Sequence, residues 1–268
     1  MSNVIQYKSS AANTDVGNSP AIWGDCPWAE IQNQVAQGRG GLAFFEDFTY
    51  VSVVDGDVLQ MLGDNAPVRV VDTLNGRLAI TSGATDNDQS ICAGEVDLVH
   101  ISDADGEKQK LWFEARVKVS SIADMGLFVG LAAESVVAVD FLADNSADLV
   151  ATAACIGFHV LTATPTAVGT SYQAASQTKQ AVQTGVHTLV ADTYVKLGMI
   201  YNPNATDAEK VTFFVNGVPQ TSFVTATNIA AATFPDSVNM TFMMTTITGE
   251  AVTKTLTPDW IRSAQLPV

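Results

Sequence analysis

Two carboxylates stand two positions apart in the segment EVDLVH, residues 95–100. Alternate side chains of a β-strand point to the same face, so a strand here would place Glu95 and Asp97 side by side. Paired carboxylates about 5–5.5 Å apart are the groups with which retaining glycosidases cleave sugars. Glycoside hydrolysis is therefore one hypothesis, and ordinary exposed carboxylates on a strand are the alternative.

The segment SDADGEK, residues 102–108, is rich in oxygen ligands. Asp103, Asp105 and Glu107 could bind calcium in a hairpin loop. The EF-hand pattern is not met, because its bidentate Glu and its flanking helices are missing. Asp and Gly also form turns without any metal. The sequence favours a plain turn, and we assign no metal ligand.

The histidines and cysteines predict neither a metal centre nor a nucleophile. Three single histidines fall on different predicted strands: His100, His159 and His187. The three cysteines form no CxxC pair and are predicted to be free thiols in a reducing compartment: Cys26, Cys92 and Cys155. No GxSxG segment is present. We predict no cofactor.

Aromatic side chains offer a possible binding surface. Four tryptophans could stack on sugar rings: Trp23, Trp28, Trp112 and Trp260. Trp112 is the best candidate, because it falls on the polar face of its predicted strand. An exposed Trp can equally anchor a protein interface. On the same face we expect Glu114 and Arg116 to form an exposed ion pair.

Composition restricts the partners. The net charge of −15 repels nucleic acid and anionic lipid, so neither is predicted as a partner. Charged residues make up 15% of the chain, below the usual ~25%. Low charge indicates either a weakly charged sandwich or a sheet surface partly covered by other subunits. The start of the chain, MSNVIQYKSS, lacks the features of a signal peptide, and no apolar run reaches the ~18 residues of a membrane helix. We expect a soluble protein made in the cytoplasm.

Residues 1–41 are predicted to form an N-terminal arm that is extended at first, because they are polar and show no sustained period. A short helix is predicted within residues 25–41, where Asp25 can cap, Pro27 suits the first turn and glycines end the helix. Three side chains share one face of this helix and should dock on the main domain or a neighbour: Trp28, Ile31 and Val35.

Residues 42–268 are predicted to form one all-β sandwich. In LWFEARVKV, residues 111–119, apolar and polar side chains alternate, which is typical of an antiparallel strand covered on one side. The continuous apolar run within residues 125–135 predicts an interior strand. Further strands are predicted at residues 41–51, 77–82, 94–102, 154–162, 194–202, 210–221, 239–248 and 255–266. Residues 172–185 are predicted to be a surface excursion.

Four segments in this order resemble the concanavalin A-like jelly roll, the fold of legume lectins, laminin-G modules and laminarinase-type glycoside hydrolases. They are FFEDF, WFEARVKVSSIADMGLFVGLA, YVKLGMIYNP with KVTFFVNGVPQ, and DWIRSAQL. The resemblance covers residues 42–268. It implies that the strand with Tyr194, Lys196 and Gly198 pairs with a strand that ends in the turn Asn216–Gly217.

The same resemblance tests the hydrolysis hypothesis. Such enzymes hold their carboxylates on one strand as Glu-x-Asp-x-(x)-Glu, which would make Glu95 the nucleophile and Asp97 its helper. However, His100 stands where the acid/base Glu is expected, and the segment precedes WFEARV where the family has it afterwards. The segment that does follow contains Glu134 and Asp140 without a Glu-x-Asp pair. We therefore predict no enzyme and assign no catalytic residue.

The chain most resembles the jelly rolls of tailed-phage virion proteins, which often carry a GLFVGLA strand, as at residues 126–132, and an N-terminal arm. This implies a structural or capsid-decoration protein located in the virion. Its partners would be capsid or tail subunits, and homo-oligomers are common among such proteins. The alternative is a lectin-like carbohydrate-binding module that binds glycans, and a degenerate glycoside hydrolase comes third.

Overall fold

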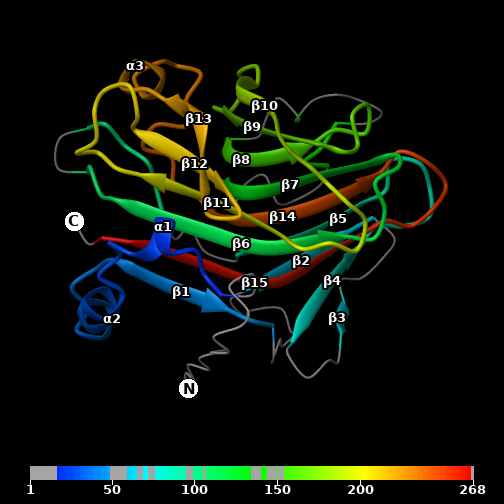
Figure 1. The fold of residues 1–268 in the computed structure, drawn as a ribbon, viewed down its shortest axis with the longest axis horizontal. Coiled ribbons are helices and arrows are strands. Elements are labelled where there is room, and N and C mark those ends of the chain that lie inside the picture. Colours follow the sequence, from blue (N-terminus) through cyan, green and yellow to red (C-terminus); the bar gives the residue numbers. More distant parts are fainter. Residues whose placement is uncertain are drawn as a thin grey trace.

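The computed structural model describes residues 17–48, 59–64, 69–71, 76–94, 99–104, 107–133, 140–143, 149 and 154–266. These residues form two antiparallel sheets packed face to face, with short helices at the periphery (Figure 1). The predicted all-β sandwich is confirmed. The helices of the described part are all too short and too polar to cross a membrane.

Sheet A has the strand order β13-β12-β11-β6-β15-β4-β3, and β1 pairs with the second half of β15. Its strands are β1 (Leu42–Glu46), β3 (Arg69–Val71), β4 (Arg77–Thr81), β6 (Leu111–Val119), β11 (Val195–Tyr201), β12 (Val211–Val215), β13 (Val218–Val224) and β15 (Thr255–Gln265). Sheet B has the order β10-β9-β8-β7-β14-β5-β2. Its strands are β2 (Leu59–Gly63), β5 (Gln89–Gly94), β7 (Met125–Ala132), β8 (Cys155–Val160), β9 (Ala167–Gln173), β10 (Gln180–Thr188) and β14 (Thr241–Thr248).

Strand β6 lies in the middle of sheet A. The alternation of apolar and polar residues in its sequence determines which side chains face the core. The predicted inner residues are all buried in the core between the sheets: Leu111, Phe113, Ala115, Val117 and Val119. Facing side chains from sheet B complete this core, as where the ring of Phe158 meets Phe213 edge-on, with centroids 5.4 Å apart. Burial of one apolar face of each sheet holds the sandwich together.

The hairpin β11–β12–β13 follows the pairing that the resemblance implied. Strand β11 pairs with β12, which ends at the turn Asn216–Gly217. Both turn residues have positive φ, 51° and 76°, as a tight two-residue hairpin turn requires. The amide of Lys196 donates to the side-chain oxygen of Asn216 at 2.9 Å, which holds the turn against β11.

Two predictions about strands were wrong or fall partly outside the described residues. The excursion predicted at residues 172–185 is instead the end of β9 and the start of β10. Strand β10 is an edge strand with two register shifts against β9, and Gly185 interrupts it with a φ of 64°. Val182 and Val186, which pack against the core, therefore stand four positions apart, and the sequence shows no alternation there. Of the strand predicted at residues 94–102, residues 95–98 lie outside the described part, and Val99 makes a single bridge to Met240.

The N-terminal segment is helical where the structure describes it. Helix α1 (Pro20–Trp23) stands where extended chain was predicted, and α2 (Trp28–Ala36) is the predicted short helix. We call residues 17–36 the strap. Figure 1 shows α1 in front of β6 and α2 next to β1, and contacts between these elements confirm both placements. The third helix, α3 (Ala226–Ile229), follows β13.

Two details of the helix prediction differ from the structure. Pro27 occupies the N-cap of α2, and no side chain caps the helix; Asp25 instead bonds to sheet A. Ile31 is fully buried as predicted, whereas Val35 is 44% exposed. Residues 1–16 of the predicted arm lie outside the described residues.

Candidate functional site

Glu114 marks the centre of the surface where the strap meets sheet A. It lies on the outer face of β6 and is completely buried beneath α1. Its Oε2 accepts hydrogen bonds from the amide of Ser19 at 3.0 Å and from Trp23 Nε1 at 2.8 Å. The predicted exposed ion pair with Arg116 is therefore wrong, because the strap covers Glu114. Arg116 pairs with Asp259 on β15 at 2.8 Å.

Burial changes the acidity of this carboxyl. Removal from water raises the pKa of Glu114, while the hydrogen bonds from Ser19 and Trp23 and the charge of Lys196 oppose the rise. The second oxygen, Oε1, is buried and accepts no hydrogen bond within the described part of the chain. The carboxylate is thus a costly group to bury, and the two donors of the strap offset part of that cost.

Trp112 lies beside Glu114, and the prediction that it is exposed is wrong. It is 1% exposed, and its Nε1 donates to Asp25 Oδ1 at 2.9 Å. Asp25 also pairs with Lys110. Burial acts to raise the pKa of Asp25, but the hydrogen bonds from Lys110 and Trp112 and the charge of Lys110 together hold this pKa below its usual value. Trp112 therefore cannot stack on a sugar ring. It belongs to an apolar cluster that joins strap and sheet and includes Ile22, Trp23, Ile31, Phe214 and Ala264.

Arg262 of β15 fastens the other side of the strap. Its guanidinium carbon lies 4.3 Å from the ring centroid of Trp23 and 3.8 Å from that of Trp28. The two indole rings meet edge-on at 5.7 Å. Desolvated cation–π contacts of this kind are worth up to ~2 kcal/mol each. Trp23 is 7% exposed and Trp28 is half-buried, so these rings also serve the protein's own packing.

The outer face of sheet B is the second candidate surface. Every residue of β5, β7, β8 and β14 is buried, so these four central strands are covered on both sides. Strand β8 follows β7 in the chain, at the place expected for a catalytic strand. Its core-facing residues alternate with Cys155, Gly157 and His159 on the outer face. None of these three is a carboxylate.

The chain itself fills part of this outer face. Phe141, Leu142 and Leu149 pack over the outward residues of β5, β7 and β14. The ring of Phe141 lies 4.7 Å from that of Phe128. The Gln89 side chain fixes Leu142 by donating to its carbonyl at 2.6 Å and accepting from its amide at 2.9 Å. An apolar cover thus occupies the surface where a sugar-cleaving sandwich would need carboxylates.

The residues of the hydrolysis hypothesis do not assemble within the described structure. Glu95, Asp97 and Glu134 lie outside the described residues. Asp140 is exposed beside Gln89, whose Nε2 is 3.5 Å from Asp140 Oδ1. His100 bonds through its Nε2 to the carbonyl of Glu107 at 3.2 Å, at a different place.

The loop with the possible calcium ligands is held by protein groups. Glu107 Oε2 accepts from the hydroxyls of Ser102 at 3.2 Å and Ser237 at 3.3 Å, and Asp103 donates its amide to Asp236 Oδ1 at 3.1 Å. Asp105 lies outside the described residues. Nowhere in the described part do three metal-ligating side chains converge. A pocket of about 160 Å³ opens next to this loop, lined by Asp103, Lys108, Tyr201, Pro203, Asp207, Lys210, Ala226 and Ile229.

The remaining candidates are scattered. His159 is buried and bonds through Nδ1 to the Ser171 hydroxyl at 3.0 Å, whereas His187 lies on β10, where partial burial lowers its pKa. The cysteines are free thiols: Cys26, Cys92 and Cys155. Burial raises the pKa of Cys26 to about 11 and that of Cys92 to about 12, so neither is a ready nucleophile.

Comparison with known proteins gives matches among solved structures alone. No family model matches the chain, and no curated protein matches it. A protein of unknown function from Shewanella oneidensis MR-1, SO2946, has a TM-score of 0.53 at 14% identity over 87% of this chain and 93% of that one. Peanut lectin has a TM-score of 0.54 at 14% identity, over 85% and 100% of the two chains. The β-glucanase of Bacillus licheniformis has 0.54 at 12%, over 84% and 98%.

Lectin and glucanase share this two-sheet architecture along nearly their whole length. The fold is a concanavalin A-like jelly roll. At such low identity the likeness shows the fold alone. In this chain the strap covers part of the outer face of sheet A, and the segment with Phe141 covers part of the outer face of sheet B.

A second part of the outer face of sheet A carries a cluster around Tyr194 that sequence reasoning missed. Arg116 lies 3.8 Å from the ring centroid of Tyr194, with Lys118 at 5.6 Å and Arg77 at 5.7 Å. These side chains come from three strands or their ends, so no local motif reveals the cluster. Lys118 also pairs with the exposed Asp192 at 3.0 Å.

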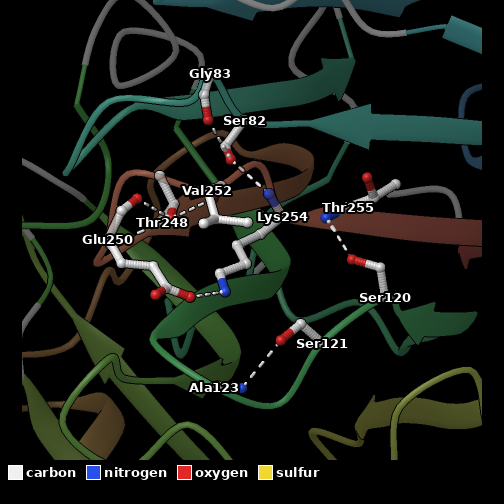
Figure 2. A network of polar contacts seen from close by, with 10 residues as sticks. All are labelled: Ser82, Gly83, Ser120, Ser121, Ala123, Thr248, Glu250, Val252, Lys254 and Thr255. Atoms are coloured by element: carbon white, nitrogen blue, oxygen red, sulfur yellow. Dashed lines mark hydrogen bonds and ion pairs between the residues drawn. The ribbon is translucent and has the colours of Figure 1, made fainter.

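Figure 2 shows a polar network at one end of the jelly roll, around the loop between β14 and β15. Lys254 is 2% exposed and pairs with Glu250. The Lys254 amide donates to Ser82 Oγ at 2.9 Å, and Ser82 Oγ donates to the carbonyl of Gly83 at 3.0 Å. The network ties this loop to the end of β4.

Proposed function

We propose that this jelly roll is a non-catalytic structural protein of a virus particle, which binds capsid or tail subunits through its N-terminal arm and the surface of the sandwich. The observation that carries the proposal is that the chain covers parts of the outer faces of both sheets with its own residues. The chain covers the outer face of sheet B with its own apolar side chains, and it fastens its strap across sheet A. The low charge and the free thiols are compatible with such a protein.

The test is sedimentation with particles at native concentration. We expect the full chain to sediment with assembled particles and a variant lacking residues 1–16 to stay in the supernatant. The deletion must end before Gly17, because Ser19 and Trp23 serve the fold through Glu114. Thermal unfolding of the deletion variant should match that of the full chain. If the full chain does not sediment together with the particles, the proposal is refuted.

Carbohydrate binding is the second candidate, since the structural neighbours include peanut lectin. One observation favours a specific place for it. Phe45 of β1 is 45% exposed, which makes it the one exposed aromatic ring within the described part of the chain. A glycan array with the full chain tests the idea. Specific binding lost in Phe45→Ala but kept in Val190→Ala, a matched change at a side chain that is 56% exposed, would support it.

A further inference from the structure

We propose that the cluster around Tyr194 binds a carboxylate on an acidic segment of a partner protein. The cluster consists of Arg77, Arg116, Lys118 and Tyr194 on the outer face of sheet A. The inference rests on the proposed function, because it names the chemistry with which the surface of the sandwich would hold a subunit of the particle.

The strand order β11-β6-β15-β4 brings these four side chains together. Arg116 and Lys118 stand two positions apart on β6, so they share its outer face. Tyr194 directly precedes β11 on one side of β6, and Arg77 begins β4 beyond β15 on the other. All four side chains are partly exposed, so a ligand at the surface can contact them.

Short side chains lie on the outer face between Lys118 and Arg77. Thr257 of β15 and Ala79 of β4 alternate with leucines that are buried in the core. Both of these short side chains are partly exposed. The surface between the two cations is therefore accessible as well.

Arg77 is the cation of the cluster that lacks a carboxylate. Arg116 pairs with Asp259 at 2.8 Å, and Lys118 pairs with Asp192 at 3.0 Å. Arg77 forms no ion pair with any residue that the structure describes. Acids are not scarce in this chain, which has 28 Asp and Glu for 13 Lys and Arg. The fork of N–H donors on Arg77 suits a carboxylate from outside the chain.

Two buried polar atoms of the cluster point to the same kind of ligand. The Tyr194 hydroxyl and Arg77 Nε make no hydrogen bond within the described part of the chain, although buried polar groups are nearly always paired. Burial raises the pKa of Tyr194, so its hydroxyl keeps its proton and can donate it to an acceptor. A carboxylate only accepts hydrogen bonds, and it therefore matches both donors. The Arg77 side chain is long and partly exposed, so it can turn its guanidinium toward such a ligand.

The same geometry argues against a sugar or a nucleic acid as the occupant. Arg116 lies 3.8 Å from the centroid of the Tyr194 ring, so it covers a face of the ring on which a sugar could stack. The net charge of −15 repels long polyanions such as nucleic acid. A carboxylate next to the cluster is still attracted, because salt screens the more distant charges of the surface beyond about 8 Å. A short acidic peptide segment is the occupant that fits.

Fluorescence anisotropy with the full chain and a labelled hexaglutamate peptide tests the site. We expect saturable binding that weakens at high salt, and no binding of a labelled hexaglutamine peptide. Arg77→Gln should weaken the binding about tenfold, as the loss of a charge-assisted hydrogen bond predicts. The matched control is Arg39→Gln, which removes the same charge from an exposed residue outside the cluster and should bind like the wild type. Equal weakening by the two changes, or a wild type that does not bind hexaglutamate, would refute the site.

A second variant covers the case in which Arg77→Gln folds poorly. Lys118→Gln loses only a pair with the exposed Asp192, so it should keep the fold and weaken peptide binding as well. Hexaglutamate binding that Lys118→Gln leaves unchanged would contradict the proposal. Binding of polygalacturonate that depends on Arg77, without binding of hexaglutamate, would overturn the peptide as occupant and assign an acidic sugar to the cluster.

The outcome is separate from the test of the proposed function, because particle sedimentation is read on the wild-type chain. Peptide binding without sedimentation would refute the proposed function and leave the carboxylate site standing. Sedimentation that Arg77→Gln does not change, together with no peptide binding, would refute the site and leave the proposed function standing.

Discussion

The indole of Trp23 donates a 2.8 Å hydrogen bond to the buried carboxylate of Glu114, which is 91 positions away in the sequence. The bond closes the strap over the middle of sheet A. It turns the polar face of a half-exposed strand into an interior surface, and it explains why neither Glu114 nor Trp112 is available to a ligand.

Removal of this acceptor should destabilise the fold. In Glu114→Ala, the donors on Ser19 and Trp23 lose their partner, which costs roughly 1–3 kcal/mol for each donor left buried. We expect the free energy of unfolding, measured by urea denaturation, to fall accordingly. Glu30→Ala is the matched control, because Glu30 lies on the exposed side of α2, where its carboxylate accepts a hydrogen bond from Gln34. An equal effect of the two changes would contradict the role of Glu114.

Stability should depend on pH through the same carboxyl. Burial raises the folded-state pKa of Glu114 above its unfolded value near ~4.3. The folded protein therefore binds the proton more tightly. The stability gained is fully present below the unfolded pKa and is lost as the pH rises through the folded pKa. Gln does not titrate, so the free energy of unfolding of the wild type should fall relative to that of Glu114→Gln as the pH rises from about 4 to about 7. Parallel curves would refute this.

Trp112 should behave as a core residue and not as a ligand contact. Trp112→Ala removes a fully buried side chain and should lower the free energy of unfolding by about 3–5 kcal/mol. Phe45→Ala, at an exposed ring, should change it by less than about 0.5 kcal/mol. Thermal or chemical denaturation of the two variants checks both values. A stable, folded Trp112→Ala would mean that the strap does not seal this surface.

Lys254 and Glu250 allow a test of how a buried charge is held. Glu250→Ala leaves the nearly buried ammonium without its carboxylate, whereas Lys254→Met keeps the apolar stem and removes the charge. We expect Glu250→Ala to be the more destabilising change, because an unpaired buried charge costs more than an apolar replacement. Lys118→Met, at the pair with the exposed Asp192, is the control and should have little effect. The reverse order would show that Lys254 is solvated.

Assays for sugar cleavage should be negative. The outer side chains of β8 are Cys155, Gly157 and His159, so they provide no paired carboxylates for hydrolysis. We expect no release of reducing sugars from β-glucans. Release that disappears in Glu95→Gln would contradict this prediction and would place the chemistry on the segment EVDLVH.

The sequence allowed the sandwich and most of its strands to be predicted, because burial between two sheets imposes a period of two that survives in β6 and a continuous apolar run in β7. The same period led to the wrong prediction that Trp112 and Glu114 are exposed. Their cover comes from residues about 90 positions upstream, and no local pattern records a contact of that range. Asp25 was misread for a similar reason, since a distant indole competes with the helix end for its carboxylate.

The candidate surfaces were harder to predict than the fold. The cover over sheet B depends on the Gln89 side chain, which bonds to both the amide and the carbonyl of Leu142, as a neighbouring strand would. No sequence pattern reveals this role of Gln89. The Tyr194 cluster depends on strand order, which brings Tyr194 and Arg77 from distant parts of the chain to Arg116 and Lys118 of β6.

Gly130 and Gly157 face each other across β7 and β8, and the backbones approach so closely that a Cβ at residue 157 would lie 2.6 Å from the carbonyl oxygen of Val129 and 2.7 Å from Gly130 Cα. An aspartate could not enter there unless the two strands moved apart. Position 157, in the middle of the outer face of β8, therefore cannot gain a carboxylate by a single substitution without separating the two strands.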